Sequence, residues 1–473
     1  MIQLYNSLTK QKEHFTPLQK GQVRMYSCGP TVYNYAHLGN LMAFCVADVL
    51  KRNLRLQGYQ VRHVMNITDI DDKTIRDSQA QHITREELTE KYTKAFFEDL
   101  DALHIDKADE FPSATAYVDH MIVFIQQLLD KQYAYQGQDN SIYFKVRQFS
   151  DYGILGNIDL DALKEGGSGR IKADEYSKEN VQDFALWKAW ESNDGPNYWE
   201  PCFTINKEKK IIKGRPGWHI ECSVMSTELL GEQIDIHTGG IDLRFPHHDN
   251  EIAQTEAVTG KQFVKYWIHN EHLLVDNKRM SKSAGNFYTL RDITGKGYRP
   301  AAFRYLVLSG HYRQQTNFTW NSLEAAQHSI ERLQDFVVRM HEITATGNAV
   351  LLDEIKAQRQ MFLDALANDL NTPVALDAIF DMIKTVYAHI DKISEHDAKE
   401  ALHVMNDFNS VFAVLCMEQE ELPPEIAKLI AQRERARTLK DWALADTLRE
   451  QLRQQGYEIE DTAQGTRWKR ISS

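Results

Sequence analysis

Thiol and imidazole groups share one short stretch near the N-terminus, SCGPTVYNYAHLGN, in which Cys28 precedes His37. The stretch follows a strand-like run, QVRMY, and leads into a long amphipathic segment, so it is predicted to be a strand-to-helix turn. Ligands of open parallel sheets bind beyond the carboxyl ends of the strands. The turn is therefore a candidate site for soft-metal binding at the thiol and for phosphate binding at the start of the helix.

Two later motifs carry further metal-binding side chains. Cys222 lies in RPGWHIECS, and His247 and Glu251 lie four positions apart in FPHHDNEIAQTEAV, at the start of a predicted helix. That spacing lets both side chains face one point. With Cys28 they would form a zinc site of two thiolates, an imidazole and a carboxylate. The spacing alone fits a core cysteine and a surface His–Glu pair equally well, because no C-x-x-C motif is present.

The remaining cysteines are assigned no chemistry. Cys45 lies in the middle of a helical segment and Cys416 lies in the apolar run VFAVLC, so both are predicted to be core residues. Cys202 is predicted to lie in a loop. An odd, sparse set of cysteines forms no disulfide framework, and the N-terminus has no secretory pattern, so we expect a reduced, cytoplasmic protein.

Phosphate-binding features occur at two places. His37, Gly39 and Asn40 stand at the predicted helix start, where N–H groups and the helix dipole favour phosphate. The segment DNKRMSKSAGNF (276–287) follows a strand-like run and carries several cations, Lys282 among them, so it can close over a triphosphate. Each feature also has an ordinary interpretation, as a chance tripeptide and as a solvated charged loop.

The elements around these motifs alternate in type, which predicts an α/β domain. A β-α-β unit at 22–28, 40–57 and 60–70 predicts a parallel sheet. Strand-like runs of such a sheet recur at 233–240 and 265–275, with a predicted helix at 248–259 between them. The intervening 150–215 region is rich in Gly, Ser, Asp and Pro and is predicted to be a loop-rich insertion.

The C-terminal third has a helical pattern. Helices are predicted from residue 321 onward, at 352–368, 373–392 and 397–416, followed by a helical segment over 423–456 and a hairpin over 457–470. The net charge of −12 argues against non-specific polyanion binding as the main role. No apolar run approaches the roughly 18–20 residues that cross a bilayer.

The chain resembles the cysteinyl-tRNA synthetases, which are class I aminoacyl-tRNA synthetases, over essentially its whole length. The motifs that carry the resemblance follow the family's order: CGPTVYNYAHLGN, NITDIDDKTI, DFALWK, GRPGWHIECS, TGGIDLRFPHHDNEIAQTEA, RMSKSAGNF and DTAQGTRWKR. It implies an α/β fold with a Rossmann-like parallel-sheet catalytic domain split by an insertion, then an α-helical anticodon-binding bundle and a small α/β C-terminal piece. The implied boundaries are 1–115 and 215–290 for the catalytic halves, 116–214 for the insertion, 291–320 for a stem-contact connector, 321–420 for the bundle and 421–473 for the last piece.

The resemblance also implies the reaction and the zinc site. Zinc held by Cys28, Cys222, His247 and Glu251 would bind the thiol of L-cysteine and reject serine without an editing site. Cysteine would attack ATP, accompanied by Mg²⁺, to give cysteinyl-adenylate, and tRNA for cysteine would then accept the amino acid. We expect a monomer that acts away from membranes.

The resemblance implies a role for each further residue. The catalytic residues would be His37, Asn40 and Lys282, and the ATP site would add Gly39, Gly239, Gly240 and Asp242. The cysteine pocket would comprise Gly29, Thr31, Thr68, Trp218, His219 and His237. A proton-transfer role remains open for His219 and His237, because each can equally be a fixed structural histidine.

Three features depart from the family's pattern. Asn40 stands where His is usual, Arg279 stands where Lys is usual, and the 200–213 link is longer, so we expect a surface hairpin there. Arg313 in the connector is expected to meet tRNA. Basic residues cluster at 433–453 and 467–470 in a chain that is acidic elsewhere, and a solvated amphipathic helix is the preferred interpretation for any single one of them.

Three alternatives remain open from the sequence. A cysteine:amino-sugar ligase would use the same adenylate but lack the long C-terminal tail. A zinc-dependent hydrolase would use the metal to activate water, which fits the basic segment poorly. A non-catalytic RNA-binding scaffold would not need intact Cys28, His37 and Lys282.

Overall fold

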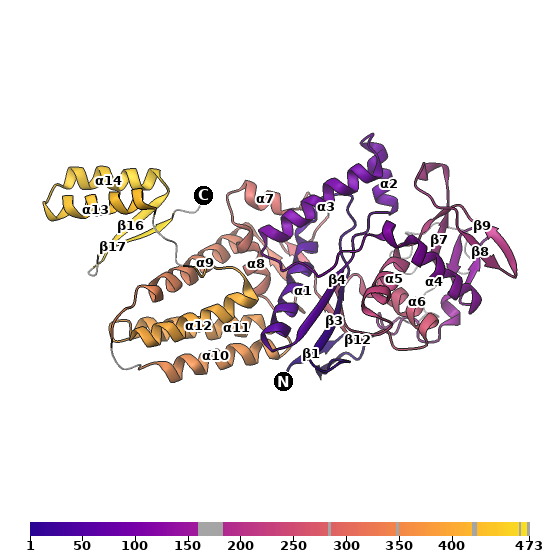
Figure 1. Ribbon diagram of the computed structural model, residues 1–473, viewed down its shortest axis with the longest axis horizontal. Helices are drawn as coiled ribbons and strands as arrows, with labels where there is room; N and C mark the ends of the chain where they lie inside the picture. Colours follow the sequence, from indigo (N-terminus) through magenta and orange to yellow (C-terminus); the bar gives the residue numbers. More distant parts are fainter. Residues whose placement is uncertain (159–182, 282–284, 347–349, 419–422, 463–464, 471–473) are drawn as a thin grey trace. The chain divides into compact units, whose positions relative to one another are not determined.

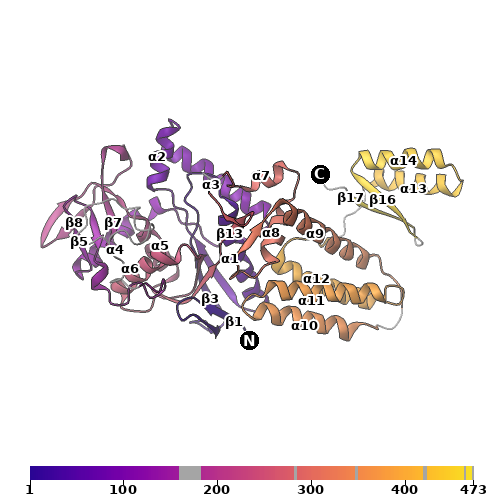
Figure 2. The ribbon, with the colours of Figure 1, turned by 180° about the vertical axis from the view of Figure 1, so that it is seen from behind.

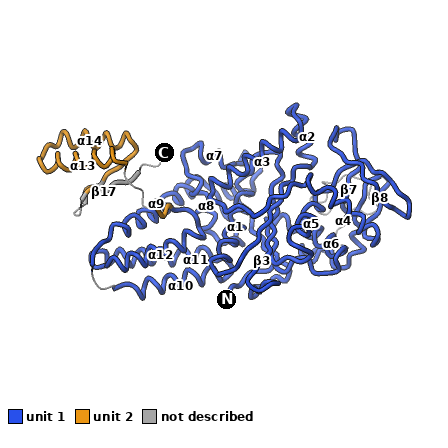
Figure 3. The backbone as a smooth tube through the Cα atoms, viewed as in Figure 1, with its two compact units in different colours: residues 1–415 blue, residues 416–473 orange. Residues whose placement is uncertain are grey.

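The computed structural model describes residues 1–158, 183–281, 285–346, 350–418, 423–462 and 465–470 (Figure 1). The chain forms two compact units, residues 1–415 and residues 416–473, which Figure 3 colours separately. None of the helices within the described ranges is both long and apolar enough to cross a membrane.

A parallel sheet lies at the centre of the first unit. Its strand order is β12 (Val264–Asn270), β11 (Ile234–Gly240), β3 (Gln22–Ser27) and β4 (Gln60–Met65). Ser27 at the end of β3 pairs with Thr238 on one side and Met65 on the other, so these strands end at one common edge. Strand β11 is buried over most of its length, as expected of a parallel strand that is covered on both faces. The predicted parallel sheet is confirmed.

Helix α1 (Leu38–Leu56) connects β3 to β4 and completes the predicted β-α-β unit. His37 caps its first turn: His37 Nδ1 accepts from the Asn40 N–H (3.1 Å), and Asn40 Oδ1 accepts from the His37 N–H (3.4 Å). Reciprocal capping satisfies N–H groups that a helix start otherwise leaves unpaired. Cys45 is buried in this helix, as predicted, and burial raises the pKa of its thiol to about 12.

Two small pieces accompany the parallel sheet, a hairpin that precedes β3 in the chain and a three-stranded sheet that follows β12. The hairpin of β1 (Gln3–Asn6) and β2 (Gln11–His14) lies beside β12, where the Ser7 N–H donates to the Trp267 carbonyl (2.9 Å). After β12, the chain forms the three-stranded sheet β14 (Lys278–Arg279), β13 (Leu273–Val275) and β15 (Thr316–Phe318). The predicted strand 265–275 is therefore two strands, because the chain turns at Glu271 and His272.

The insertion forms a smaller antiparallel sheet of order β10-β7-β6-β5. Helices α2 (Asp72–Ala80) and α3 (Arg85–Ala102) precede this region, which is reached through η1 (Ala114–Tyr117). Its further elements are α4 (Val118–Asp130), β5 (Ala134–Gln136), β6 (Ile142–Phe144), η2 (Val146–Gln148), β7 (Phe184–Ala189), η4 (Ser192–Asp194) and β10 (Gly214–Pro216). The glycine-rich KEGGSGRIKADEY stretch lies outside the described residues. Strand β10 leads into α5 (Trp218–Leu230), which carries Cys222 back to the parallel sheet.

The long link at 200–213 forms a hairpin, as predicted. Strands β8 (Cys202–Ile205) and β9 (Glu208–Ile211) pair antiparallel through Asn206 and Lys207, both of which have positive φ. A two-residue hairpin turn with both φ values positive matches the twist of the strands. Phe203 anchors the hairpin in the core, whereas Cys202 is exposed.

Helices form the C-terminal part of the first unit, and those of residues 320–412 lie side by side in Figures 1 and 2. They are α7 (Leu290–Gly295), α8 (Pro300–Leu308), α9 (Trp320–His341), α10 (Leu352–Ala367), α11 (Thr372–Ala388) and α12 (Glu395–Phe412). Arg304 on α8 is fully buried, pairs with Asp48 of α1 and donates to the Val411 carbonyl at the end of α12 (3.1 Å). The predicted helical region is thereby joined directly to the catalytic-side helix α1.

The second unit contains α13 (Pro424–Thr438), α14 (Trp442–Gln454), and the hairpin β16 (Tyr457–Thr462) and β17 (Gly465–Arg470). The prediction that 423–456 is helical is confirmed, with two helices in place of a continuous run. The chain breaks at Lys440, which has φ 60°, and Asp441 caps the next helix by accepting from the Leu444 N–H (3.1 Å). The predicted core position of Cys416 was wrong: α12 ends at Phe412, so Cys416 lies beyond the packed helix and is exposed.

Candidate metal and nucleotide site

The two widely separated cysteines meet at the carboxyl edge of the parallel sheet. Cys28 directly follows β3, and its N–H extends the ladder by donating to the Thr238 carbonyl (3.3 Å). Cys222 comes from the second turn of α5. Their Sγ atoms are 3.9 Å apart. The fold therefore brings together two thiols whose sequence positions gave no sign of contact.

Helix α6 (Asp249–Thr259) completes the cluster, with the preceding turn η5 (Arg244–His248). Glu251 Oε1 lies 3.1 Å from His247 Nε2 and 3.8 Å from Cys28 Sγ. The donor atoms of Cys28, Cys222, His247 and Glu251 all lie within 4.8 Å of one another. Tetrahedral zinc, with bonds of roughly 2.0–2.3 Å, would separate its ligands by roughly 3.3–3.8 Å. The separations of 3.1, 3.8 and 3.9 Å among these donors lie close to the values for such an ion.

A second, overlapping set of donors shares Cys28 and Glu251. It adds His237 and His248, and its donor atoms also lie within 4.8 Å of one another. His248 Nε2 is 3.3 Å from Cys28 Sγ, and His237 Nε2 is 2.9 Å from Glu251 Oε2. The sequence analysis assigned nothing to His248, although the doubled histidine of FPHHDN was the available signal. The cluster therefore offers more ligands than one tetrahedral ion needs.

Burial governs the electrostatics of this cluster. It raises the pKa of the Cys28 thiol well above its usual range, and Cys222 and Glu251 raise it further. Burial likewise raises the pKa of Cys222 and lowers that of His247 to about 3. Neutral imidazole is the form that binds a metal, and a dication offsets the cost of burying two thiolates. The donor chemistry thus suits a soft divalent cation.

Other aromatic and imidazole groups fix the orientation of the donors. His219 Nδ1 is 2.8 Å from His247 Nδ1, and the Trp218 ring stacks on His247 at 4.2 Å between centroids. The His237 ring stacks on the Trp267 ring, with 4.6 Å between centroids, and its Nε2 atom lies at hydrogen-bond distance from Glu251. Partners of this kind hold ligand side chains in place. Three of the predicted cysteine-pocket residues, Trp218, His219 and His237, therefore contact candidate ligands directly.

The other predicted pocket residues lie on two adjoining segments. Thr31 and Thr68 form a parallel bridge, and Gly29 donates its N–H to Asn66 Oδ1 (2.8 Å). Thr68 Oγ1 donates to Glu221 Oε2 (2.7 Å). Burial raises the pKa of Glu221 well above its usual range, and Glu221 Oε1 has no hydrogen-bond partner within the described part of the chain. Asn66 and Glu221 are thus polar groups of the site that sequence reasoning missed.

The predicted nucleotide residues lie at the start of α1. A Cβ at Gly39 would lie only 3.0 Å from the His37 ring, so glycine leaves that ring uncovered. Asn40 is exposed. The His37 ring packs edge-on against Phe287 at 5.2 Å, and the Leu38 N–H donates to the Tyr288 carbonyl (2.9 Å). The segment that follows RMSKSAG therefore lies against the helix start. Lys282 itself lies outside the described residues.

The TGGID motif ends β11 beside the same edge. Gly239 is buried, and a Cβ there would come within 2.8 Å of the His248 ring, so only glycine fits. Gly240 is half-buried and Asp242 is exposed on the following turn. Since β11 is the neighbour of β3, the predicted ribose and adenine residues lie on the same edge as Cys28.

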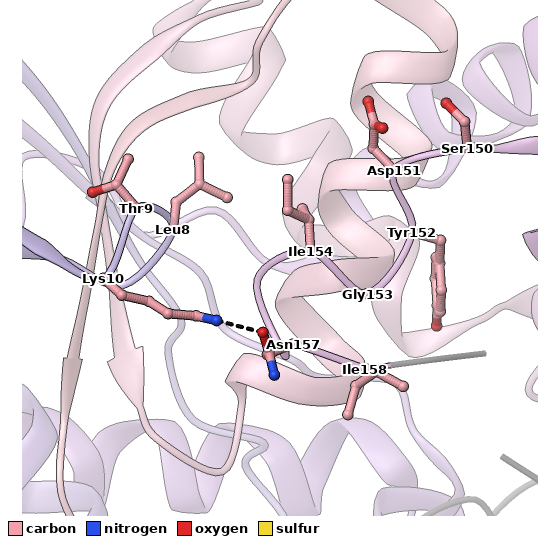
Figure 4. A pocket seen from close by; sticks show the side chains of 10 residues that line it. All are labelled: Leu8, Thr9, Lys10, Ser150, Asp151, Tyr152, Gly153, Ile154, Asn157 and Ile158. Atoms are coloured by element: carbon pink, nitrogen blue, oxygen red, sulfur yellow. Dashed lines mark hydrogen bonds between the residues drawn. The ribbon is translucent and has the colours of Figure 1, made fainter. Parts of the chain in front are cut away.

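One pocket holds none of the predicted site residues (Figure 4). It lies between the β1–β2 turn and the segment 150–158, where Lys10 donates to Asn157. Asp249 at the start of α6 holds this segment by accepting from the N–H groups of Leu155 (3.0 Å) and Gly156 (2.8 Å). The pocket wall therefore supports the helix that carries Glu251.

Arg313 has an internal partner in the structure. Its guanidinium lies 2.7 Å from Asp369 Oδ2 and sits over the Tyr5 ring at 4.5 Å. Its contact with tRNA stays a prediction, and any such contact would compete with this ion pair.

Comparisons with known proteins show the family to which the chain belongs. A family model described as the class I (C) tRNA synthetase catalytic domain matches residues 14–328. The DALR domain matches 361–417, and the cysteinyl-tRNA ligase anticodon binding domain matches 419–468, which falls in the second unit.

Among curated proteins, the chain is 46% identical to a cysteine–tRNA ligase of Protochlamydia amoebophila, over 99% of this chain and 98% of that protein. It is also 46% identical to one from Brachyspira hyodysenteriae, over 99% of each. A solved methionyl-tRNA synthetase of Mycobacterium tuberculosis shares the fold, with a TM-score of 0.61 at 12% identity, over 83% of this chain and 92% of that one. The chain belongs to the cysteine–tRNA ligase family of class I aminoacyl-tRNA synthetases.

Proposed function

We propose that the chain attaches L-cysteine to its tRNA in two steps, through a cysteinyl-adenylate made from ATP and Mg²⁺. The single observation that carries the proposal is the convergence of Cys28, Cys222, His247 and Glu251 at the sheet edge that also bears the start of α1. Sulfur recognition and phosphate binding are then side by side, as a reaction between an amino acid and ATP requires.

In this proposal, Cys28, Cys222, His247 and Glu251 hold the zinc ion. Bound zinc would supply a soft acceptor that favours a thiolate over the hydroxyl of serine. His237 and Trp218 act on the ligands: His237 holds the Glu251 carboxylate and Trp218 stacks on the His247 ring. We prefer this set to the His237–His248 set because it contains both thiolates, and each imidazole it leaves out contacts a ligand of the set.

At the nucleotide end, the chain's own groups bind and neutralise phosphate. The N–H groups at the start of α1 and the His37 imidazole face the position proposed for the triphosphate, and Lys282 stabilises charge that develops on the leaving pyrophosphate. Gly239, Gly240 and Asp242 receive the ribose and adenine. The substrate cysteine lies between the two ends, against Gly29, Thr31, Thr68, Trp218 and His219.

The second unit and the helical bundle are proposed to bind tRNA. The match of residues 419–468 to an anticodon-binding domain supports this role for the second unit. The basic residues of α13 and α14 provide the charge that phosphate contacts need. We also propose that the chain acts as a monomer in the cytoplasm.

The test is cysteine-dependent exchange of pyrophosphate into ATP, with serine as the control substrate, together with tRNA charging and a metal count on the purified protein. We expect exchange with cysteine only, charging of tRNA, and one zinc per chain. Exchange without charging would favour the amino-sugar ligase, and hydrolysis without exchange would favour the metallohydrolase. Equal exchange with serine would contradict the role proposed for zinc.

A further inference from the structure

The segment that follows β4 is packed tightly against the segment that carries Cys28. The Thr68 N–H donates to the Pro30 carbonyl and the Val32 N–H donates to the Thr68 carbonyl, both at 3.1 Å. A Cβ on Gly29 would lie only 1.7 Å from the Asn66 carbonyl oxygen. The two backbones therefore touch beside Cys28, and no side chain fits at Gly29.

The buried Asn66 side chain has only one orientation that its neighbours permit. The Gly29 backbone N–H can only donate, so the atom 2.8 Å from it must be the Asn66 amide oxygen. The amide nitrogen then faces Thr68 Oγ1 (3.1 Å) and donates to it. The Thr68 hydroxyl consequently donates its hydrogen bond to Glu221 Oε2 (2.7 Å). Each bond in this chain determines the direction of the next.

Both thiols are connected to this amide. Cys28 is connected through the next residue, Gly29, whose N–H donates to Asn66 Oδ1. Cys222 is connected twice, because its Sγ lies 3.7 Å from Asn66 Oδ1 and the adjacent Glu221 accepts from Thr68. One side chain directly after β4 thus bridges a strand end and a helix that are otherwise distant in sequence.

We propose that Asn66 is a positioning residue that sets the separation of the Cys28 and Cys222 thiols for metal binding. The proposal deepens the function proposed above and rests on it for the identity of the ligands. Without the amide, Gly29 loses its acceptor, and the Thr68–Glu221 pair loses the donor that orients it. The two thiols would then no longer be held at one distance in the metal-free protein.

The test measures metal binding in the full-length protein, apart from catalysis. Zinc affinity is measured by competition with a chromophoric chelator, and Co²⁺ is added to record thiolate-to-metal charge-transfer absorption per bound ion. For Asn66→Ala we expect an affinity loss of about 10–100-fold, the range seen for residues that support metal ligands, with weaker charge-transfer absorption. Unchanged affinity and absorption would overturn the proposal.

The matched control is Asn53→Ala. Asn53 is also a fully buried asparagine of the first unit, and its amide donates to the Leu366 carbonyl (3.1 Å), with no hydrogen bond to either thiol. The control should bind both metals as the unmodified protein does. An equal loss in Asn53→Ala would mean a general effect of destabilisation and would overturn the specific role of Asn66.

A second pair of variants keeps the question answerable if Asn66→Ala does not fold. Thr68→Ser keeps the hydroxyl that links Asn66 to Glu221, whereas Thr68→Val removes it, so serine should retain the Co²⁺ absorption and valine should lose part of it. Equal absorption in the two variants would contradict the proposal. If the unmodified protein binds Co²⁺ through two thiolates but shows no cysteine-dependent exchange, the proposed function fails while the role of Asn66 stands.

Discussion

The two ends of the candidate site are built differently. At the sulfur end, the donor groups are buried, lie within 4.8 Å of one another, and are held by further histidines and by Trp218. At the phosphate end, Asn40 is exposed, and His37 and Asn40 bond to each other across the first turn of α1. The sulfur end is therefore assembled before any ligand arrives, whereas the phosphate end, in the proposed function, would exchange its own capping bonds for bonds to the nucleotide.

The difference follows from what each end must distinguish. Choosing sulfur over oxygen requires fixed soft ligands in a dry environment, because a loosely held site would accept both. Triphosphate binding requires donors and positive charge, which a helix start supplies while it stays open to solvent. We therefore expect substitutions at the sulfur end to abolish metal binding and activation together, and those at the phosphate end to slow activation alone.

The largest effect is expected for Cys222→Ser, which breaks the sulfur end. A serine hydroxyl is a poor zinc ligand at neutral pH, so zinc content and cysteine-dependent exchange should fall together, each by at least about 100-fold. The measurement is metal analysis beside pyrophosphate exchange. Cys202→Ser, on the exposed strand β8, serves as the control and should change neither value. Full exchange activity in Cys222→Ser would remove Cys222 from the ligand set.

The next effect tests the phosphate end with the sulfur end intact. Lys282→Ala should lower the rate of exchange by about 10²–10³-fold, since it removes a charge that acts on the leaving pyrophosphate. Zinc content should stay the same. Lys261→Ala removes an exposed lysine that pairs with Glu232 and should leave exchange unchanged. Loss of zinc in Lys282→Ala would show that the two ends are not separable.

An intermediate effect is expected for His237→Ala, which sharpens the choice between the two donor sets. His237 Nε2 holds Glu251 at 2.9 Å, so its loss should weaken zinc affinity by about 10–100-fold while zinc still binds. His247→Ala should weaken affinity more, as expected for a direct ligand. The reverse order in the chelator competition would favour the set with His237 and His248.

The smallest effect concerns pH and a buried histidine on β4, the edge strand of the parallel sheet. His63 lies beside Ser27, and burial, together with the positive charge of Lys51, lowers its pKa to about 3. In the unfolded chain the pKa of this group is about 6.5. The folded state therefore binds this proton less readily. The contribution of neutral His63 to the free energy of unfolding is complete above pH ~6.5. It is lost as the pH falls toward 3, by up to about 1.4 kcal/mol per pH unit.

The change that tests this is His63→Gln. The melting temperature of the variant should decline less steeply than that of the unmodified protein between pH 7 and 5. His328→Gln, at an exposed position of α9, should retain the unmodified slope. Identical slopes for the protein and His63→Gln would contradict the effect of burial.

Sequence patterns predicted the parallel sheet because β3 and β11 have long buried runs and α1 has a helical apolar period. The hairpin within 200–213 was predicted from the extra length of that link compared with the family, and its turn at Asn206 and Lys207 was not. The helical pattern over 423–456 did not reveal the reversal at Lys440. The core prediction failed at Cys416, because the apolar run continues beyond the end of α12.

The candidate site was less accessible from spacing alone. Cys28 and Cys222 come together only through the pairing of β3 with β11 and the packing of α5, which no local pattern encodes. The resemblance to a family supplied that contact. Asn66, Glu221 and His248 were missed because their roles depend on partners far away in the sequence.

The distribution of thiols has a practical consequence. Cys202 on the β8–β9 hairpin and Cys416 at the junction of the units are exposed, while Cys45 and Cys222 are buried and Cys28 is half-buried. Thiol-specific dyes should therefore react first with one position in each unit of the unmodified chain. Energy transfer between such dyes would report changes in the separation of Cys202 and Cys416 when RNA is added, with no cysteine introduced by mutation.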